Sequence, residues 1–191
     1  MNIEATLSTL MCGNQLKQTA RTGWSQRGVA DAENVAAHSY GVAYTVLLLA
    51  PLVSQPIDLG KALAIAVLHD LPESLTSDIP SPAWRLMPEG VKPLVENRAM
   101  ESILGSAAGG KELLATWREL HEYETAEARL VSDADQLDLY LQALIYEEQT
   151  GNRRLGEFWQ RPAEFHFPEA HALYEELVRR RQRDAAAPTD R

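Results

Sequence analysis

The chain of 191 residues is short of cysteine, of basic charge and of long apolar runs, and each shortage excludes a class of protein. Its single cysteine, Cys12, cannot form a disulfide within the chain, which fits a reducing compartment. Its 18 basic residues against 27 acidic ones give a net charge of −9, which argues against a nonspecific binder of nucleic-acid polymers. The longest apolar run, residues 42–53, is too short to span a bilayer, and the N-terminus does not resemble a signal peptide. We therefore expect a soluble cytoplasmic protein that does not act on membranes.

Apolar residues recur with helical spacing over most of the chain. The pattern predicts seven helices, over residues 3 to about 12, 34–49, 58 to about 70, 91–104, 111–121, 125–148 and 168–181. Asn34, or Asp31 one turn earlier, and Asp58 are the expected N-caps of the second and third helices. We find no strand pattern, internal repeat or glycine-rich phosphate loop. The sequence therefore predicts an all-α fold in one domain, residues 1–183, followed by a disordered tail, residues 184–191.

The third helix ends in an unusually charged stretch, "LHDLPESLTSDIP" at residues 68–80. His69 and Asp70 are adjacent, about 100° apart on a helix, so that their side chains can converge on one ion between them. Glu73 lies on the same face if the helical path continues. Imidazole with carboxylate suits Mn, Co, Fe, Ni or Zn better than Ca. A helix-end histidine can also act only as a cap, so the spacing leaves a metal site and a structural role open.

Further ligands have to come from other helices. His38 lies in the first turn of the second helix, and Asp133 and Asp135 lie in the long sixth one. These two acids are about 200° apart, so both cannot face one site. Val131 and Leu139 flank Asp135 one turn away, and a carboxylate in such a setting is costly unless it is paired or binds a cation. We therefore expect Asp135 at the metal and Asp133 behind the site or facing solvent.

The ordered set of a histidine, a His-Asp pair and a distant aspartate resembles the HD superfamily of metal-dependent phosphohydrolases. The resemblance extends to the 5′-deoxynucleotidases, the family that includes HD-domain-containing protein 2. It is carried, in order and spacing, by "RTGW" (21–24), "ENVAAHS" (33–39), "LHDLPESLTSDIP" (68–80), "DADQLDLYLQALIYE" (133–147) and "EFHFPEA" (164–170). The resemblance implies a single HD-domain bundle of roughly six to nine helices. It also allows a homodimer.

The resemblance also implies roles for individual residues. The ligands of one divalent transition metal would be His38, His69, Asp70 and Asp135. The catalytic acids would be Glu73 and Asp78, and the contacts to substrate phosphate and nucleoside would be Arg21 and Trp24. The implied reaction is hydrolysis of a (deoxy)ribonucleoside 5′-monophosphate to nucleoside and phosphate.

Elementary chemistry fits these roles. The metal can neutralise phosphoryl charge and lower the pKa of a bound water, which Glu73 could orient or deprotonate. Asp78 could do the same or protonate the leaving 5′-oxygen, and both roles stay open. Taken alone, Arg21 could be a solvated loop residue and Trp24 a core residue.

Three positions depart from the family pattern. Ala37 replaces an acid before the first histidine, so any support which that acid gives is missing or comes from elsewhere. Ser77 replaces a glycine before Asp78, where a positive φ would be easier without a side chain. Pro72 either ends the helix before Glu73 or kinks it.

Two other functions stay open. One is a different HD chemistry: a dNTP triphosphohydrolase, a cyclic-nucleotide phosphodiesterase or a specialised metabolic phosphatase. The other is a non-catalytic nucleotide-binding protein.

Overall fold

The computed structural model describes residues 3–160 and 163–186, and within them the fold is all-α. Its elements, in chain order, are α1 (Ile3–Gln15), α2 (Thr22–Ser25), α3 (Val35–Leu49), α4 (Leu59–Leu68), α5 (Glu73–Thr76), α6 (Ser81–Trp84), α7 (Val91–Leu104), α8 (Gly110–Glu122), α9 (Ala126–Thr150), the 3₁₀ helix η1 (Arg153–Gln160) and α10 (Pro168–Ala186). The seven long helices confirm those predicted from the periodicity. The short α2, α5, α6 and η1 carry too few turns to give a periodic signal.

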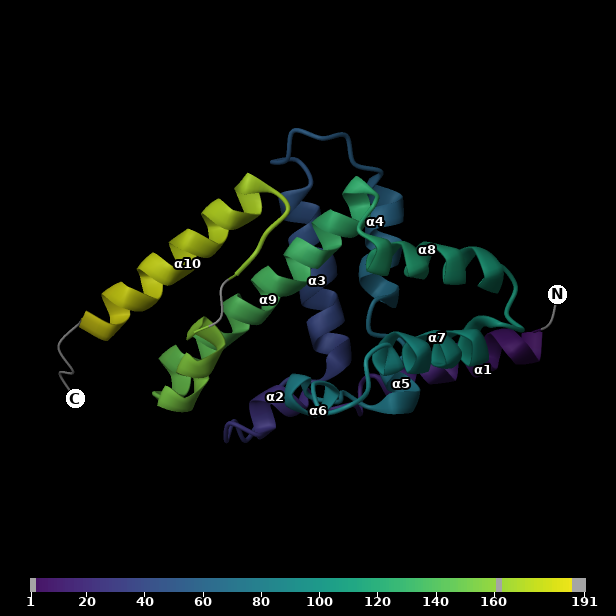
Figure 1. Cartoon of the computed structure of the whole chain (residues 1–191), viewed down its shortest axis with the longest axis horizontal. Coiled ribbons are helices and arrows are strands. Elements are labelled where there is room, and N and C mark those ends of the chain that lie inside the picture. Colours follow the sequence, from purple (N-terminus) through teal and green to yellow (C-terminus); the bar gives the residue numbers. More distant parts are fainter. Residues whose placement is uncertain (1–2, 161–162, 187–191) are drawn as a thin grey trace.

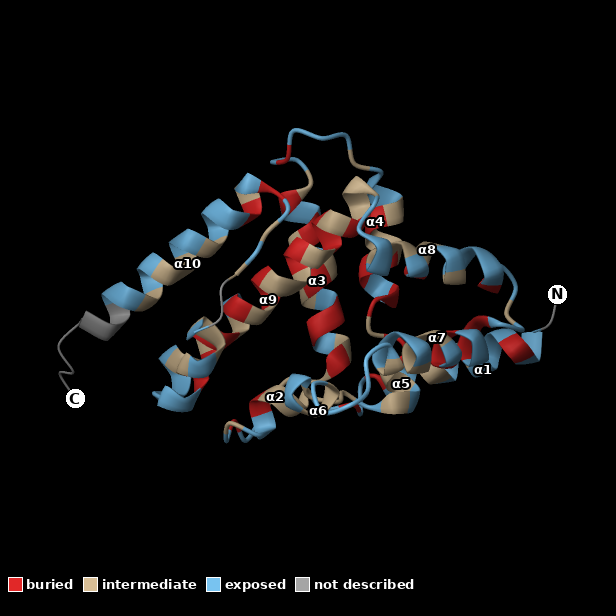
Figure 2. Ribbon diagram, viewed as in Figure 1, coloured by how far each residue is buried: buried red, intermediate tan, exposed pale blue. Residues whose placement is uncertain are grey.

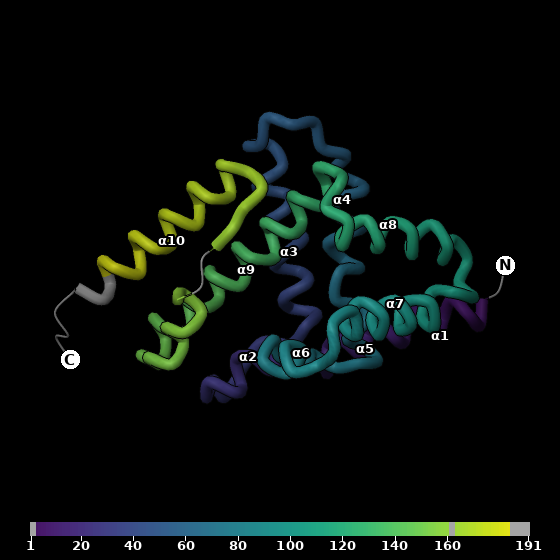
Figure 3. Tube along the Cα trace, in the orientation of Figure 1, coloured from purple at the N-terminus to yellow at the C-terminus, as the bar shows by residue number. Residues whose placement is uncertain are grey.

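The long helix α9 runs through the middle of the molecule and packs against both α3 and α4 (Figure 1). The core between them is formed by apolar side chains such as Val42 and Val46 of α3, Ile65 of α4, and Leu130 and Val131 of α9, all fully buried. The inward faces of these three helices are accordingly buried along most of their length (Figure 2). Helix α10 lies along the other side of α9 (Figure 3). The shared core thus fixes α3, α4 and α9 relative to one another.

A second apolar cluster lies beneath the C-terminal end of α4. Leu68 and Leu71 pack there with Met100 and Ile103 of α7 and Trp117 of α8. The Trp117 indole also donates a hydrogen bond of 3.2 Å to the backbone oxygen of His69. The cluster thus holds the backbone at the very point where the chain leaves α4.

Side-chain caps begin the helices where the sequence predicts them. The Asn34 side chain accepts a hydrogen bond from Ala37 N at 2.9 Å, and the Asp58 side chain accepts one from Lys61 N at 3.0 Å. Each cap satisfies a backbone donor that the first helical turn leaves unpaired. The predictions of Asn34 and Asp58 as caps are confirmed.

Helix α10 ends at Ala186, three residues into the segment predicted to be a disordered tail. Upstream of this end, paired charges join α10 to α9, since Arg180 binds Glu148 at 3.0 Å and Arg181 binds Glu147 at 2.6 Å. The rest of the predicted tail, residues 187–191, lies outside the described residues. No helix in the described part of the chain is long and apolar enough to cross a membrane.

Candidate metal centre and active site

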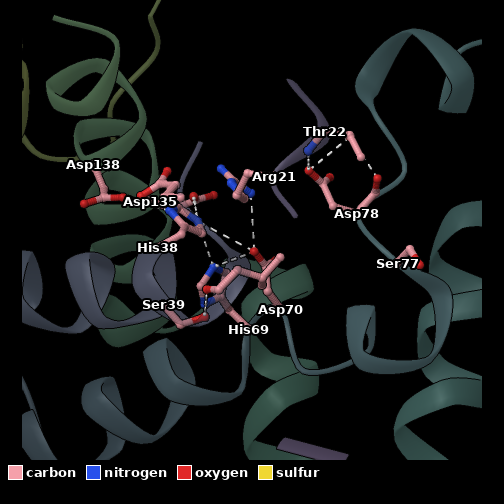
Figure 4. Close-up of polar contacts among 12 residues, drawn as sticks. Arg21, Thr22, His38, Ser39, His69, Asp70, Ser77, Asp78, Asp135 and Asp138 are labelled. Carbon is pink, nitrogen blue, oxygen red and sulfur yellow. Dashed lines mark hydrogen bonds and ion pairs between the residues drawn. The ribbon is translucent and has the colours of Figure 1, made fainter. Parts of the chain in front are cut away.

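Three helices bring two histidines and two aspartates together (Figure 4). His38 comes from the first turn of α3, His69 and Asp70 from the turn directly after α4, and Asp135 from the middle of α9. The Nε2 atoms of His38 and His69 are 3.3 Å apart. His38 Nε2 lies 3.0 Å from Asp135 Oδ1, and His69 Nε2 lies 3.2 Å from Asp70 Oδ2. The structure therefore brings together all four residues that the sequence analysis assigned to the metal.

Both imidazoles are oriented by hydrogen bonds at their other nitrogen. His69 Nδ1 donates to the Ala66 backbone oxygen at 2.7 Å, and His38 Nδ1 donates to Asp138 Oδ2 at 2.8 Å. An acceptor at Nδ1 holds the proton there and turns the Nε2 lone pair toward the centre. Each ring thus turns Nε2 toward the cluster, where it could bind a cation.

The spacing of these atoms fits one small cation. Two ligands at about 2.1 Å from a tetrahedral or octahedral metal are about 3.0–3.4 Å apart, which matches the three separations above. The His38 Nε2–Asp70 Oδ2 distance is slightly longer, at 3.6 Å. Asp70 Oδ2 is buried and has no hydrogen-bond partner among the described residues, although it lies close to both histidines and Arg21. A carboxylate oxygen buried there without a hydrogen bond is costly, and a bound cation would offset that cost. His38, His69 and Asp135 also form a group whose ligand atoms all lie within 4.8 Å of one another.

The electrostatics of the centre favour charged aspartates beside the histidines. Burial alone would raise the pKa of Asp70, but His69, and then His38 and Arg21, lower that pKa well below its usual range. Burial alone would lower the pKa of His38, but its hydrogen bonds to Asp135 and Asp138 raise that pKa to about 10. The aspartates therefore attract positive charge to the Nε2 side of the site, where a divalent cation would take the place of a proton.

Of the two alternatives for Pro72, a break or a kink in the helix, the structure shows the break. Helix α4 ends at Leu68, and Pro72 is the N-cap of α5, whose first residue is Glu73. Tight hydrogen bonds join the two helices, among them Leu71 N to Leu68 O and Glu73 N to Asp70 O, both 3.0 Å. The chain thus keeps turning without a continuous α-helix.

This turn carries the Glu73 side chain to the wall of the same pocket. Its Oε2 is buried and has no hydrogen-bond partner among the described residues. Burial, and then repulsion from Asp70 and Asp78, raises the pKa of Glu73 to about 9. A cation bound beside Asp70 would oppose this repulsion and favour the ionised form.

The loop of Asp78 is tied to the loop of Arg21. Asp78 Oδ2 accepts hydrogen bonds from Thr22 N at 2.6 Å and Thr22 Oγ1 at 3.2 Å. Ser77, just before it, has φ 62° and ψ 166°, a conformation that glycine adopts far more easily. Serine thus adopts the positive φ that was expected to suit glycine better at this position.

Arg21 faces the candidate metal centre, whereas Trp24 is almost fully buried at the pocket wall. Arg21 Nη1 is 3.5 Å from Asp70 Oδ2, and although burial lowers the pKa of Arg21, Asp70 and the other nearby carboxylates raise it above its usual value. Trp24 is only 1% exposed, and its indole donates to Glu33 Oε1 at 2.9 Å. Its ring packs against Phe158, whose other neighbour is the Arg27 guanidinium, 4.2 Å from the ring centroid. The buried ring of Trp24 thus supports the wall that Arg27 and Phe158 form.

A cavity of about 320 Å³ opens from the metal centre, large enough for a small ligand. Its charged lining includes Arg21, Arg27, Asp70, Glu73, Asp78, Lys92 and Asp135, and its aromatic lining includes Trp84, Tyr140 and Phe158. Cations, acids and flat apolar surfaces therefore meet in one pocket. Such a pocket suits a ligand with an anionic group at one end and a ring at the other.

Two acids of α9 lie where the sequence did not predict them. Asp133 is fully buried, so the alternative in which it faces solvent is wrong. Its two oxygens accept hydrogen bonds from the backbone of His166 at 2.9 Å and Phe167 at 2.8 Å, which fixes the start of α10. Asp138 was not singled out from the sequence, although it follows Asp135 by three residues and so shares its helix face. It contacts His38, and an acid is thus present there even though position 37 is alanine.

Comparison with known proteins identifies the family of this helical domain with its candidate metal site. The model of the HD domain family matches residues 13–171, which is most of the chain. The chain therefore belongs to the HD domain family.

Named relatives and solved structures cover nearly the whole chain. The 5′-deoxynucleotidase HDDC2 of Danio rerio is 33% identical over 91% of this chain and 86% of its own length. The protein of the same name from Homo sapiens is 32% identical over 95% of this chain and 88% of its own length. The crystal structure of the PH0347 protein from Pyrococcus horikoshii OT3 superposes with a TM-score of 0.75 at 32% identity, over 93% of this chain and 98% of that one.

Proposed function

We propose that this protein is a metal-dependent phosphomonoesterase that hydrolyses deoxyribonucleoside 5′-monophosphates to nucleoside and phosphate. One observation carries the proposal: His38, His69, Asp70 and Asp135 converge beside Arg21 at the base of a pocket. Relatives named 5′-deoxynucleotidase, similar over nearly the whole chain, support the choice of substrate.

The four ligands would hold one divalent transition metal, with Mn, Co, Fe, Ni and Zn all compatible with nitrogen and oxygen donors. When bound, such a metal supplies a Lewis acid that offsets phosphoryl charge and makes water a better nucleophile. Arg21 would hold the phosphate, because its planar guanidinium can donate two parallel hydrogen bonds to phosphate oxygens. Its pairing with Asp70 keeps it close to the centre.

Glu73 is the proposed general base. Its carboxylate lines the pocket and retains a buried oxygen without a partner in the described structure, ready to accept a proton from water. Asp78 shares the pocket, but its Oδ2 is engaged by Thr22, so we assign it first to holding the Arg21–Thr22 loop. Donation of a proton to the leaving 5′-oxygen is a second role that its position in the lining supports.

The nucleoside would lie against the aromatic side of the pocket. Phe158 lines it, with Trp24 packed behind, and Tyr140 lies nearby on α9. A flat apolar wall accepts any base, because every base has a polarisable face.

The test is phosphate release from dAMP, dCMP, dGMP and dTMP after removal of metal and reconstitution with Mn or Co. We expect release from at least one of them, metal dependence, and loss of both activity and metal in Asp135→Asn. Release of triphosphate from a dNTP, or cleavage of a cyclic nucleotide, would favour another HD chemistry. A folded protein that binds no metal and melts at the same temperature with or without Mn would favour the non-catalytic alternative. The homodimer stays a prediction, which light scattering on the purified protein tests.

A further inference from the structure

Asp138 contacts a proposed metal ligand from the side opposite the metal. Its Oδ2 lies 2.8 Å from His38 Nδ1, and the side chain of His38 is fully buried. Figure 4 shows Asp138 and Asp135 extending from the same helix to the two ends of the His38 ring. One turn of α9 thus supplies a partner for Nε2 and another for Nδ1.

The direction of this hydrogen bond follows from the two partners. An ionised carboxylate can only accept, so Nδ1 carries the proton and Nε2 keeps its lone pair for a cation. A carboxylate at Nδ1 also makes Nε2 more basic and fixes the plane of the ring. Glu33 lies near His38 and Asp138, but its Oε1 is engaged by the Trp24 indole. The direct partner of Nδ1 is therefore Asp138.

Gly41 makes room for this carboxylate. It follows His38 by three residues on α3 and so faces the same side of the helix. A Cβ at position 41 would overlap Asp138 Oδ1 and approach Asp138 Cγ to 2.8 Å. Its φ is not positive, so space and not backbone conformation is what requires glycine here. Even alanine would force the carboxylate to move.

We propose that Asp138 is a positioning residue that orients His38 for metal binding, and that Gly41 is required to seat it. The proposal rests on the metal centre proposed above and adds two residues to it. Neither residue contacts the metal or the substrate. A substitution at either position should therefore weaken metal affinity only through its effect on His38. The proposal also predicts that the two substitutions act through the same contact.

The experiment measures the dissociation constants of Co²⁺ and Mn²⁺, by chelator competition, together with the melting temperature of the metal-free protein. Asp138→Ala should weaken metal binding about 10- to 100-fold. Asp138→Asn keeps an acceptor of similar shape but loses the charge, so it should give a smaller loss and guard against failure of the alanine variant to fold. Gly41→Ala should reproduce the loss seen in Asp138→Ala.

A double-mutant cycle separates positioning from general disruption. With Asp138→Ala already present, Gly41→Ala should weaken metal binding no further, because the carboxylate that it displaces is gone. The matched control is Asp133→Asn, a buried acid on the same helix that binds backbone groups instead of a histidine. It should lower the melting temperature and leave the metal dissociation constant unchanged.

Two results would overturn the inference. One is a metal affinity in Asp138→Ala and Gly41→Ala equal to that of the unsubstituted chain. The other is a loss of affinity that merely follows the loss of melting temperature, so that Asp133→Asn, at an equal loss of melting temperature, weakens metal binding by as much as Asp138→Ala does. Failure of the unsubstituted chain to bind Co²⁺ or Mn²⁺ would instead refute the metal centre itself, and this inference with it.

Discussion

Replacing Ser77 with glycine should stabilise the protein. The φ of 62° and ψ of 166° at Ser77 lie in a region that only glycine enters freely, and a residue held there costs about 1–3 kcal/mol. Glycine would relieve that strain but lose about 0.5–1 kcal/mol through the greater freedom of the unfolded chain. The side chain of Ser77 is exposed, so little packing is lost. We expect a net gain of about 1 kcal/mol, or roughly 2–4 °C in melting temperature for a domain of this size.

Urea denaturation and thermal melting of the metal-free protein measure this gain. The matched control is Ser77→Ala, which removes the hydroxyl but keeps the Cβ that causes the strain. It should leave the stability nearly unchanged. Equal stability of the glycine and alanine variants, or a loss of stability with glycine, would refute the argument that Ser77 is strained. Because Asp78 follows directly, the pair also tests whether relaxing this loop changes the Michaelis constant.

Three further predictions concern the acids and the arginine of the site. Asp133→Asn should lower the free energy of unfolding by about 1–3 kcal/mol, since one of two buried backbone donors loses its acceptor; unchanged urea denaturation would contradict this. Glu73→Gln should lower kcat by at least about 100-fold with little change in metal affinity, because the amide cannot accept the proton; a kcat near that of the unsubstituted enzyme would exclude Glu73 as the base. Arg21→Lys should raise KM for nucleotide more than it lowers kcat, since lysine cannot donate two parallel hydrogen bonds; equal KM values would place the phosphate elsewhere.

The sequence predicts the long helices well because each of them buries one face. Periodic apolar residues place α3, α7 and α9 to within a few residues of their ends, and the caps Asn34 and Asp58 begin helices as expected. The short helices α2 and α5 are invisible to this reasoning, since one turn is held by tertiary contacts and not by an apolar stripe. Helix α10 runs five residues beyond its predicted end at residue 181, because the polar residues there carry no apolar period that would mark the helix.

The two acids of α9 show where reasoning from sequence neighbours fails. Asp135 was preferred because its neighbours along the helix are apolar, yet its side chain is 46% exposed and opens to the pocket, whereas Asp133 is fully buried. The backbone of the distant segment at residues 166–167 decides this, because it supplies two donors to Asp133. Helical geometry correctly predicts that Asp133 and Asp135 cannot face one site, but it does not predict what Asp133 contacts.

A glycine in the apolar run of α3 could have pointed to Asp138. A glycine inside a helix costs stability relative to alanine, so it implies that something approaches its Cα closely. Position 41 lies three residues after His38, on the same face, and a carboxylate three residues after Asp135 is the partner that chemistry would choose for a buried imidazole. The two spacings together predict a contact between α3 and α9 that neither predicts alone.

The packing of the core explains why the proposed centre can be held firmly although two of its ligands, His69 and Asp70, follow the end of a helix. Helix α4 ends at Leu68, and the residues after it would be mobile if only local backbone hydrogen bonds held them. Here the cluster of Leu68, Leu71 and Trp117 packs directly beneath it, and the Trp117 indole binds the backbone oxygen of His69. The substitution Trp117→Phe removes that hydrogen bond and keeps the aromatic packing. His69 would then lose this restraint on its backbone, whereas Asp135 would keep its place on α9. Metal affinity should then fall more than stability does, because the apolar cluster that stabilises the fold is nearly intact while the geometry of one ligand is not.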